Sequence, residues 1–189
     1  MAVLMVAQYE LDLDMPEPPE SARMTERGML DLLHRRYGQR SYNGGVDAPR
    51  FICAEHVRDK AGFERRTLDF MAIDTWESSM RAGWLTVHGV EVKVSRSDWL
   101  RELKDPDKAA VGMHYATHRW LAIPDPLMVR EGELPVGWGL LCVKGARGLV
   151  AHIQAAGRRP EPLEPTAIAA LLRAVAKTAV AQASKEPQP

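Results

Sequence analysis

The stretch HGVEVKVSRSDWL, residues 88–100, contains two patterns in succession. In its first half, valine occupies every second position, which is the period of a β-strand with one buried face. The opposite face then carries three polar side chains, those of Glu91, Lys93 and Ser95. An acid and a base on one strand face either point to water or form a site, and the rest of the chain decides between these readings.

The second half of the stretch has the features of a helix start. Ser95 and Ser97 are both suitable N-cap residues, and Ser95 with Asp98 resembles a capping box. The first N–H groups of a helix attract phosphate, and Arg96 adds a positive charge there. We therefore predict that Ser95 and Arg96 contact a phosphate group, while a serine caps the helix in either case.

Working outward from this stretch, hydrophobic periodicity and turn residues predict an α/β (α+β) fold with a mixed central sheet flanked by helices. Helices are predicted at residues 24–38, 97–104, 105–118 and 165–183. Strands are predicted at residues 50–58, 65–76, 84–95, 119–124, 134–145 and 148–155. The core order is helix, three strands, helix, strand. The predicted parts are an irregular lead-in (1–22), the main domain (23–156), a linker and C-terminal helix (157–184) and a disordered tail (185–189).

The first and last predicted helices carry apolar stripes that should face the core. In the first, Thr25 is the expected N-cap, Gly38 the expected end, and the stripe consists of Met29, Leu30, Leu33 and Tyr37. In the last, one side carries Ile168, Leu171, Leu172 and Val175.

The composition is that of a soluble globular protein. The chain has 189 residues, 46% of them hydrophobic, with 25 basic and 25 acidic side chains. Neutrality argues against a protein that coats nucleic acid through excess positive charge, but it allows a local basic groove such as residues 32–40. No apolar run reaches the roughly 18 residues of a membrane span, and the start MAVLMVA lacks signal-peptide features. We expect a cytoplasmic protein without membrane contact, with Cys53 and Cys142 reduced.

Asp69 is the candidate partner of Glu91 and Lys93, because it interrupts the otherwise apolar stretch TLDFMAI. A buried carboxylate costs free energy without a partner, and two carboxylates about 4 Å apart repel by roughly 4 kcal/mol at an effective dielectric of 20. Mg²⁺ would neutralise such a pair through oxygen ligands, and Glu26 of the first helix offers a further oxygen. The alternative is a buried Asp–Lys–Glu network that only joins two strands. Asp74 is a rival to Asp69, but it should lie on the opposite face at a strand end.

Two further pairs come from the predicted helix at residues 105–118. Lys108 and Tyr115 are seven residues apart, so they share a helix face and are candidates for contacting a phosphate. His114 and His118 have the four-residue spacing of metal ligands on a helix, but no third ligand follows at a suitable distance. We therefore do not predict a zinc site.

The segments TLDFMAI, HGVEVKVSRSDWLRELKDPDKAA, WLAIP and LPVGWGLLCV resemble the PD-(D/E)xK nuclease superfamily, nearest to its MmcB-like and phage restriction-endonuclease-like group. The resemblance covers roughly residues 24–155. It implies a restriction-endonuclease-like core and hydrolysis of nucleic-acid phosphodiesters with Mg²⁺, for which Mn²⁺ substitutes. The implied catalytic residues are Asp69, Glu91, Lys93 and Glu26, with Asp69, Glu91 and Glu26 as metal ligands. Substrate contacts are implied for Lys108 and Tyr115. The proline that names the motif is absent before Asp69.

The sequence thus predicts a metal-dependent deoxyribonuclease acting in DNA repair or phage DNA processing. The alternative is a catalytically silent nuclease-fold module that binds DNA or a partner protein. A purely structural or regulatory protein is the third reading. Substrate form, sequence specificity and oligomeric state, a homodimer included, remain open.

Overall fold

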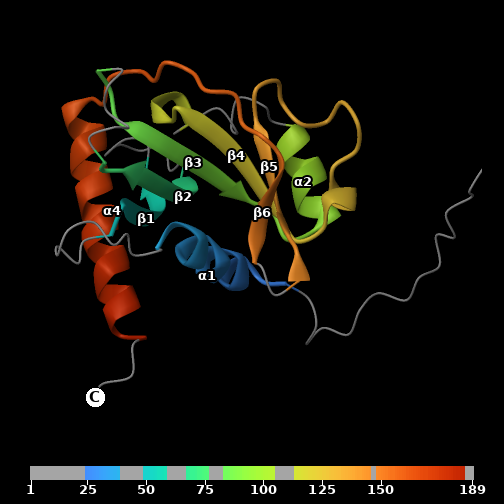
Figure 1. Ribbon diagram of the computed structural model, residues 1–189, viewed down its shortest axis with the longest axis horizontal. Coiled ribbons are helices and arrows are strands. Elements are labelled where there is room, and N and C mark those ends of the chain that lie inside the picture. Colours follow the sequence, from blue (N-terminus) through green and yellow to red (C-terminus); the bar gives the residue numbers. More distant parts are fainter. Residues whose placement is uncertain are drawn as a thin grey trace, which may run out of the picture.

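The computed structural model describes residues 24–38, 49–58, 67–76, 83–104, 113–145 and 148–185 (Figure 1). Six strands form one sheet in the order β1-β2-β3-β4-β5-β6, so the sheet follows the chain order. The strands are β1 (Phe51–Arg58), β2 (Thr67–Asp74), β3 (Thr86–Val92), β4 (His118–Ile123), β5 (Gly139–Val143) and β6 (Leu149–Ile153). The helices are α1 (Glu26–Tyr37), α2 (Arg96–Leu103) and α4 (Pro165–Ala183), with single 3₁₀ turns η3 (Met113–Tyr115) and η4 (Pro126–Met128).

The sheet is mixed, and the fold class is α+β as predicted. Strands β1, β2 and β3 form an antiparallel meander, β4 and β5 run parallel to β3, and β6 is antiparallel to β5. The β3–β4 pair is parallel, and parallel neighbours need a crossover connection because a tight turn would reverse the chain direction. Here the crossover contains α2. The chain therefore passes from the end of β3 at Val92 directly to the start of α2 at Arg96.

The alternation along β3 has the predicted consequence. Val90 and Val92 are buried on the face that packs against Met29, Leu30 and Leu33 of α1. Helix α1 begins and ends as expected, with Thr25 Oγ1 accepting from Gly28 N at 3.1 Å and Gly38 at the C-cap. The valines and the α1 stripe therefore form one core, and the odd-numbered residues of β3 face the other way.

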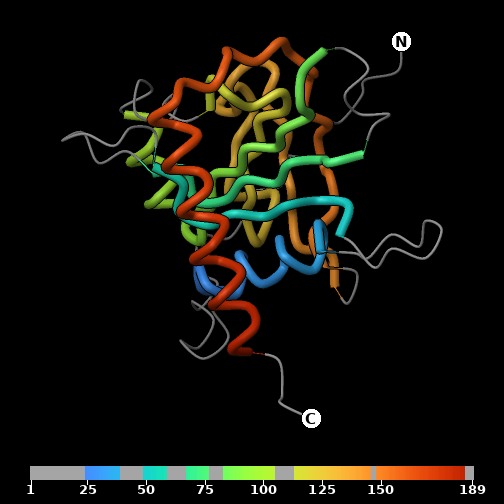
Figure 2. Tube along the Cα trace, turned by 90° about the vertical axis from the view of Figure 1, so that its left-hand side faces the viewer, coloured from blue at the N-terminus to red at the C-terminus, as the bar shows by residue number. Residues whose placement is uncertain are grey.

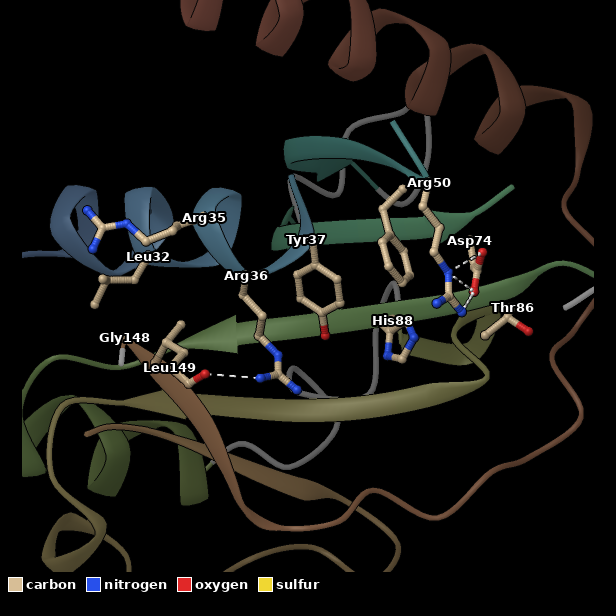
Figure 3. A pocket seen from close by; sticks show the side chains of 11 residues that line it. Leu32, Arg35, Arg36, Tyr37, Arg50, Asp74, Thr86, His88, Gly148 and Leu149 are labelled. Carbon is tan, nitrogen blue, oxygen red and sulfur yellow. Dashed lines mark hydrogen bonds and ion pairs between the residues drawn. The ribbon is translucent and has the colours of Figure 1, made fainter. Parts of the chain in front are cut away.

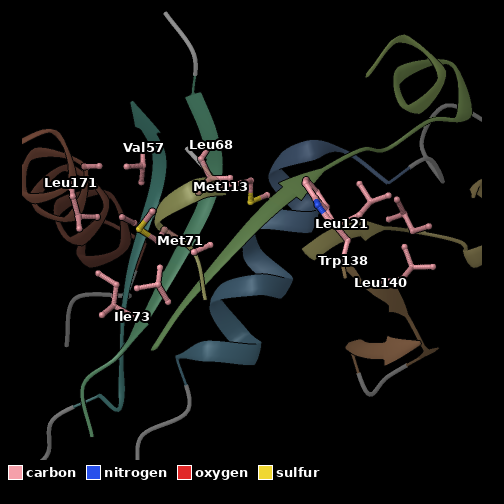
Figure 4. Close-up of a cluster of buried hydrophobic side chains, with 14 of the residues drawn as sticks. Val57, Leu68, Met71, Ile73, Met113, Leu121, Trp138, Leu140 and Leu171 are labelled. Atoms are coloured by element: carbon pink, nitrogen blue, oxygen red, sulfur yellow. The ribbon is translucent and has the colours of Figure 1, made fainter. Parts of the chain in front are cut away.

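A second core fills the opposite face of the sheet (Figure 4). It contains Leu68, Met71 and Ile73 from β2, Leu121 from β4 and Leu171 from α4, with Trp99 of α2 at 2% exposure. Helix α4 packs against β1, and Figure 2 shows it in front of that strand. The free edge of β1 is partly closed by this helix, since Glu55 N donates to Thr178 Oγ1 at 2.9 Å.

The predicted buried stripe of the last helix was wrong in part. Leu171 is buried, but Ile168 and Leu172 are 42% and 62% exposed. The buried face instead consists of Ala167, Leu171, Ala174 and Thr178. Small side chains bring the helix axis close to β1, so the alanines pack although they add little to a hydrophobicity pattern.

Among the described helices, α4 is also the one that is long and apolar enough, by length and composition, to cross a membrane.

The predicted helix at residues 105–118 was wrong at its described end. Only Met113–Tyr115 form a 3₁₀ turn, and residues 105–112 lie outside the described residues. Thr117 explains why residues 116–118 are not helical, because its Oγ1 accepts from Val87 N and donates to Val87 O, both at 2.8 Å. These two bonds hold Thr117 against β3, and β4 starts one residue earlier than predicted, at His118.

The segment between β6 and α4, expected as a linker, is bound to the sheet domain. Arg158 N donates to Thr117 O at 2.9 Å, and Glu161 N donates to His114 O at 3.0 Å. Residues 1–23 and 186–189 lie outside the described part, so the lead-in and nearly all of the predicted tail stay predictions.

Glu55 joins three elements on the α1 face. Its carboxylate accepts two bonds from Arg27 at 2.6 and 2.7 Å and is 2.6 Å from His34 Nε2, while Gln182 of α4 lies at 3.4 Å. Burial would raise the pKa of Glu55, but the hydrogen bonds from Arg27 and His34 outweigh it and lower the pKa to about 2. Glu55 is therefore ionised throughout the physiological range and links α1 to β1.

Replacing Glu55 with glutamine should lower the free energy of unfolding by about 1–3 kcal/mol at pH 7. The lowered pKa means that this stabilisation is complete above the usual value of 4.5 and is lost as the pH falls from there toward about 2. Urea unfolding at pH 7 and pH 3 measures both points, with Glu131→Gln in an exposed turn as the control. An equal loss at both pH values would show that the carboxylate charge is not what stabilises this junction.

Candidate metal centre

The candidate site lies where the pairing of β2 and β3 ends. The last paired residues are Phe70 and Val90, so Asp69 and Glu91 are the next two that face each other. Here Asp69 Oδ2 accepts a hydrogen bond from Val92 N at 2.8 Å, so the N–H of Val92 is paired with a side chain instead of with the backbone of β2. The two carboxylates therefore lie on adjoining strands, with Glu91 on the face opposite the valines.

Lys93 joins this pair from just beyond the end of β3. Its Nζ lies 2.6 Å from Glu91 Oε1 and 3.4 Å from Glu102 Oε2. The three side chains are between 10% and 14% exposed, so the network is largely shielded from water. Lys93 N also donates to Ala122 O at 3.0 Å, which holds this residue beside β4. The backbone of Lys93 is thus held by β4, and its ammonium group is held by Glu91 and Glu102.

Glu102 of α2 is a member of the site that the sequence analysis did not find. Glu102 and Lys104 repeat the acid-x-Lys spacing, but residues two apart on a helix do not face each other, so the spacing alone does not indicate a site there. The useful signal was the buried Trp99, since a residue three positions later lies on the same helix face and points toward the sheet.

His56 is the second residue that was missed. It falls between the pairs Glu55–Phe70 and Val57–Leu68, and therefore opposite Asp69. Its φ of 51° is the one positive value among the described non-glycine residues, in a region that side chains seldom adopt. Ligand atoms of Glu26, His56 and Asp69 all lie within 4.8 Å of one another, with Glu26 and His56 exposed. The structure thus brings Glu26 and Asp69 together, as predicted.

The electrostatics of the site show a shortage of positive charge. Burial, followed by the charge of Asp69, raises the pKa of Glu91 to about 7 although Lys93 opposes the shift. Burial also raises the pKa of Asp69. Burial would lower the pKa of Lys93, but its carboxylate neighbours raise it instead, so Lys93 stays protonated. With Glu102, three carboxylates share one ammonium group, and a bound cation would relieve their repulsion.

The donor set fits a hard divalent cation. Glu26 and Asp69 provide carboxylate oxygens within 4.8 Å of each other, the ligands that Mg²⁺ and Mn²⁺ prefer, whereas Glu91 is not a member of that group and is paired with Lys93. His56 alone contributes an imidazole nitrogen, and no described cysteine accompanies it. This composition favours Mg²⁺ or Mn²⁺ over zinc.

Two of the predicted phosphate contacts have structural partners. Ser95 Oγ accepts from Asp98 N at 3.2 Å and donates to Asp98 Oδ2 at 2.7 Å, so it is the N-cap of α2. Arg96 forms an ion pair with Glu133 and donates to Met128 O at 2.8 Å. Its charge is therefore neutralised by the loop after β4, and the structure does not place Arg96 among the site carboxylates.

The remaining candidates lie elsewhere. Tyr115 is 7% exposed and lines a cleft with Val87 and Leu163, away from the acidic cluster, while Lys108 lies outside the described residues. Asp74 is at the end of β2, as predicted, where Arg50 Nη2 approaches it to 2.6 Å.

The histidine pair does not converge on a common site. The ring of His114 lies 4.0 Å from that of Tyr115, whereas the ring of His118 stacks on His88 at 4.9 Å. The two cysteines are free thiols, Cys53 in β1 and Cys142 in β5. Neither pair offers a second metal centre.

Comparison with family models, curated proteins and solved structures found no match for the chain. A functional assignment therefore depends on the geometry of the acidic site and on the motif that the sequence carries.

Proposed function

We propose that this protein is a metal-dependent nuclease, a hydrolase of nucleic-acid phosphodiester bonds with DNA as the favoured substrate, acting in DNA repair or phage DNA processing. The observation that carries the proposal is the position of Asp69 and Glu91 on adjoining strands, with Lys93 bound to Glu91. The order α1, β1 to β3, α2, β4 is also the order of a restriction-endonuclease-like core, and we assign that fold as part of the same proposal.

Asp69 and Glu91 would hold the ion, and Glu26 would add a further oxygen from the start of α1. When bound, Mg²⁺ or Mn²⁺ supplies positive charge that polarises the phosphate and makes a nearby water more acidic. The protein contributes the position of these carboxylates. The Val92 N–H fixes Asp69, and Lys93 fixes Glu91.

Lys93 acts as a charge rather than as a base in this proposal. Its carboxylate neighbours raise its pKa, so the amine keeps its proton at neutral pH. A protonated lysine orients a water molecule through its donors and stabilises the negative charge that grows on the phosphate oxygens. The water oxygen would attack phosphorus in line and release a proton to the solvent, and the bond between phosphorus and the leaving oxygen would break as that oxygen takes up a proton.

Cleavage of labelled linear, hairpin, flap and junction DNA tests the proposal directly. We expect products with Mg²⁺ or Mn²⁺ and none with EDTA. Saturating Mn²⁺ at about 100 times its Kd should also raise the melting temperature by roughly 5–10 °C, since such binding is worth about 2.7 kcal/mol and each kcal/mol shifts a chain of this size by about 2–4 °C.

The other outcomes separate the alternatives. Salt-dependent DNA binding without products under either metal would indicate the catalytically silent module. A melting temperature that Mn²⁺ does not change, without DNA binding, would leave the carboxylate–lysine network as a purely structural link between β2, β3 and α2.

A further inference from the structure

A cavity lies on the α1 face of the sheet, at the end of α1 and the start of β3 and therefore away from the acidic site (Figure 3). Its volume is about 670 Å³, and it lies between the end of α1, the starts of β1 and β3, and the start of β6. Pockets that bind small organic molecules commonly measure about 300–1,000 Å³. The cavity is therefore large enough for a ligand of nucleotide size.

Two buried polar groups in this cavity have no partner. Tyr37 is only 4% exposed, yet neither its hydroxyl nor Arg36 Nε has a hydrogen-bond partner among the described residues. Figure 3 shows the Tyr37 hydroxyl directed into the space between Arg36 and His88. An unsatisfied buried polar group costs about 1–3 kcal/mol, so two of them side by side indicate a site that a ligand completes.

The guanidinium of Arg36 is already positioned for such a ligand. Its Nη1 donates to Leu149 O at 3.0 Å, which anchors the guanidinium beside the cavity. Arg50 is paired with Asp74, but no described carboxylate pairs with Arg35 or Arg36. The cavity therefore has an excess of positive charge.

His88 adds a neutral donor. Trp120 Nε1 donates to His88 Nδ1 at 3.0 Å, so the ring proton of the neutral imidazole is on Nε2. Burial, and then the positive charge of His118, lowers the pKa of His88 to about 4. Donors thus dominate the cavity, and a ligand with acceptors only, such as a phosphate, fits them.

One wall of the cavity is aromatic. The ring of Tyr37 lies 5.2 Å from that of Phe51 and 5.3 Å from that of His88. Rings at these distances form an apolar surface against which a planar heterocycle can pack. The cavity therefore combines anion donors with an aromatic surface.

We propose that this cavity binds a nucleoside monophosphate group, with its phosphate on Arg36 and Tyr37 and its base against the aromatic wall. The group is either a free nucleotide or the 5′-phosphorylated end of a strand, which share this chemistry. The proposal does not rest on the nuclease activity, because the cavity is lined by the end of α1 and the start of β3, whereas Glu26 and Glu91 of the acidic site lie at the start of α1 and near the end of β3.

Isothermal titration of the full chain in EDTA tests this with deoxyadenosine 5′-monophosphate, deoxyadenosine and inorganic phosphate. We expect the nucleotide to bind at least about 10-fold more tightly than either part. A 5′-phosphorylated and an unphosphorylated deoxyadenosine tetramer then separate the two sources. A 5′-phosphorylated tetramer that binds as tightly as the nucleotide indicates a strand end, and one that does not bind indicates a free nucleotide.

Variants make the test specific. Arg36→Gln and Tyr37→Phe should each weaken nucleotide binding at least about 10-fold, and Tyr37→Phe should leave the ligand-free melting temperature unchanged or higher, because it removes an unsatisfied hydroxyl. Arg101→Gln, an equal charge change on the exposed side of α2, should bind as the parent does, and so should Asp69→Asn. Equal binding by all four variants, no binding by the parent, or phosphate binding as tightly as the nucleotide would overturn the proposal.

Discussion

Replacing Asp69 with asparagine should abolish metal-dependent cleavage, with a loss of at least about 10³-fold, while the fold survives. The amide loses the negative charge that attracts the ion, and metal contributions of several kcal/mol to the transition state correspond to factors of this size. The remaining Oδ1 still accepts a hydrogen bond from Val92 N, so the junction of β2 and β3 is kept.

The same substitution should stabilise the metal-free protein by about 1 kcal/mol at pH 7, because it removes the repulsion between Asp69 and Glu91. Urea unfolding in EDTA measures this gain, and the Mn²⁺-dependent rise in melting temperature should vanish. Asp31→Asn, at an exposed position of α1, is the matched control and should cut at the parent rate. A variant that cuts like the parent would remove Asp69 from the mechanism.

Replacing Lys93 with methionine should have the opposite effect on stability and a similar effect on cleavage. Without the ammonium group, Glu91 and Glu102 lose their cation, and breaking a buried ion pair on one side is costly. We expect a loss of about 2–4 kcal/mol at pH 7 and a smaller loss at pH 5, where Glu91 with its pKa raised to about 7 takes up a proton. Cleavage should fall by about 10²–10³-fold.

Manganese distinguishes the two roles of Lys93. Added Mn²⁺ should recover part of the stability of Lys93→Met, because it replaces the missing positive charge, but it should not recover cleavage. Lys104→Met, at the exposed end of α2, tests whether any lysine nearby would matter. Parent-like cleavage by Lys93→Met would reduce this residue to a structural link.

The parts of the fold that could be predicted are those with a strong local signal. The alternation of residues 90–94 predicts which face of β3 is buried, and Thr25 and Ser95 predict two helix starts, as found. Asp69 was found because a lone acid interrupts an apolar strand. Local patterns were enough for these elements because their neighbours in space reinforce the same choice.

The parts that could not be predicted depend on contacts between distant segments. Glu102 and His56 join the acidic site only because α2 folds back over β3 and because β1 aligns His56 with Asp69. Thr117 is held beside β3 by its bonds to Val87, thirty residues away, and the helical pattern of residues 105–118 does not reveal this contact. The sequence gives no sign that Arg36 and Tyr37 line a cavity. They have the pattern of a basic and an apolar residue at the end of a helix, and a sequence does not show which polar groups lack a hydrogen bond.

The position of α4 has a consequence for how the chain is made. This helix covers β1, yet more than a hundred residues separate them along the chain, from Arg58 to Pro165. As synthesis proceeds, the apolar side of β1 and β2 and the open backbone edge of β1 stay without their cover until Leu171 and Thr178 have left the ribosome. A nascent or truncated chain that ends before α4 therefore exposes an unpaired strand edge, which is a site for aggregation or for chaperone binding.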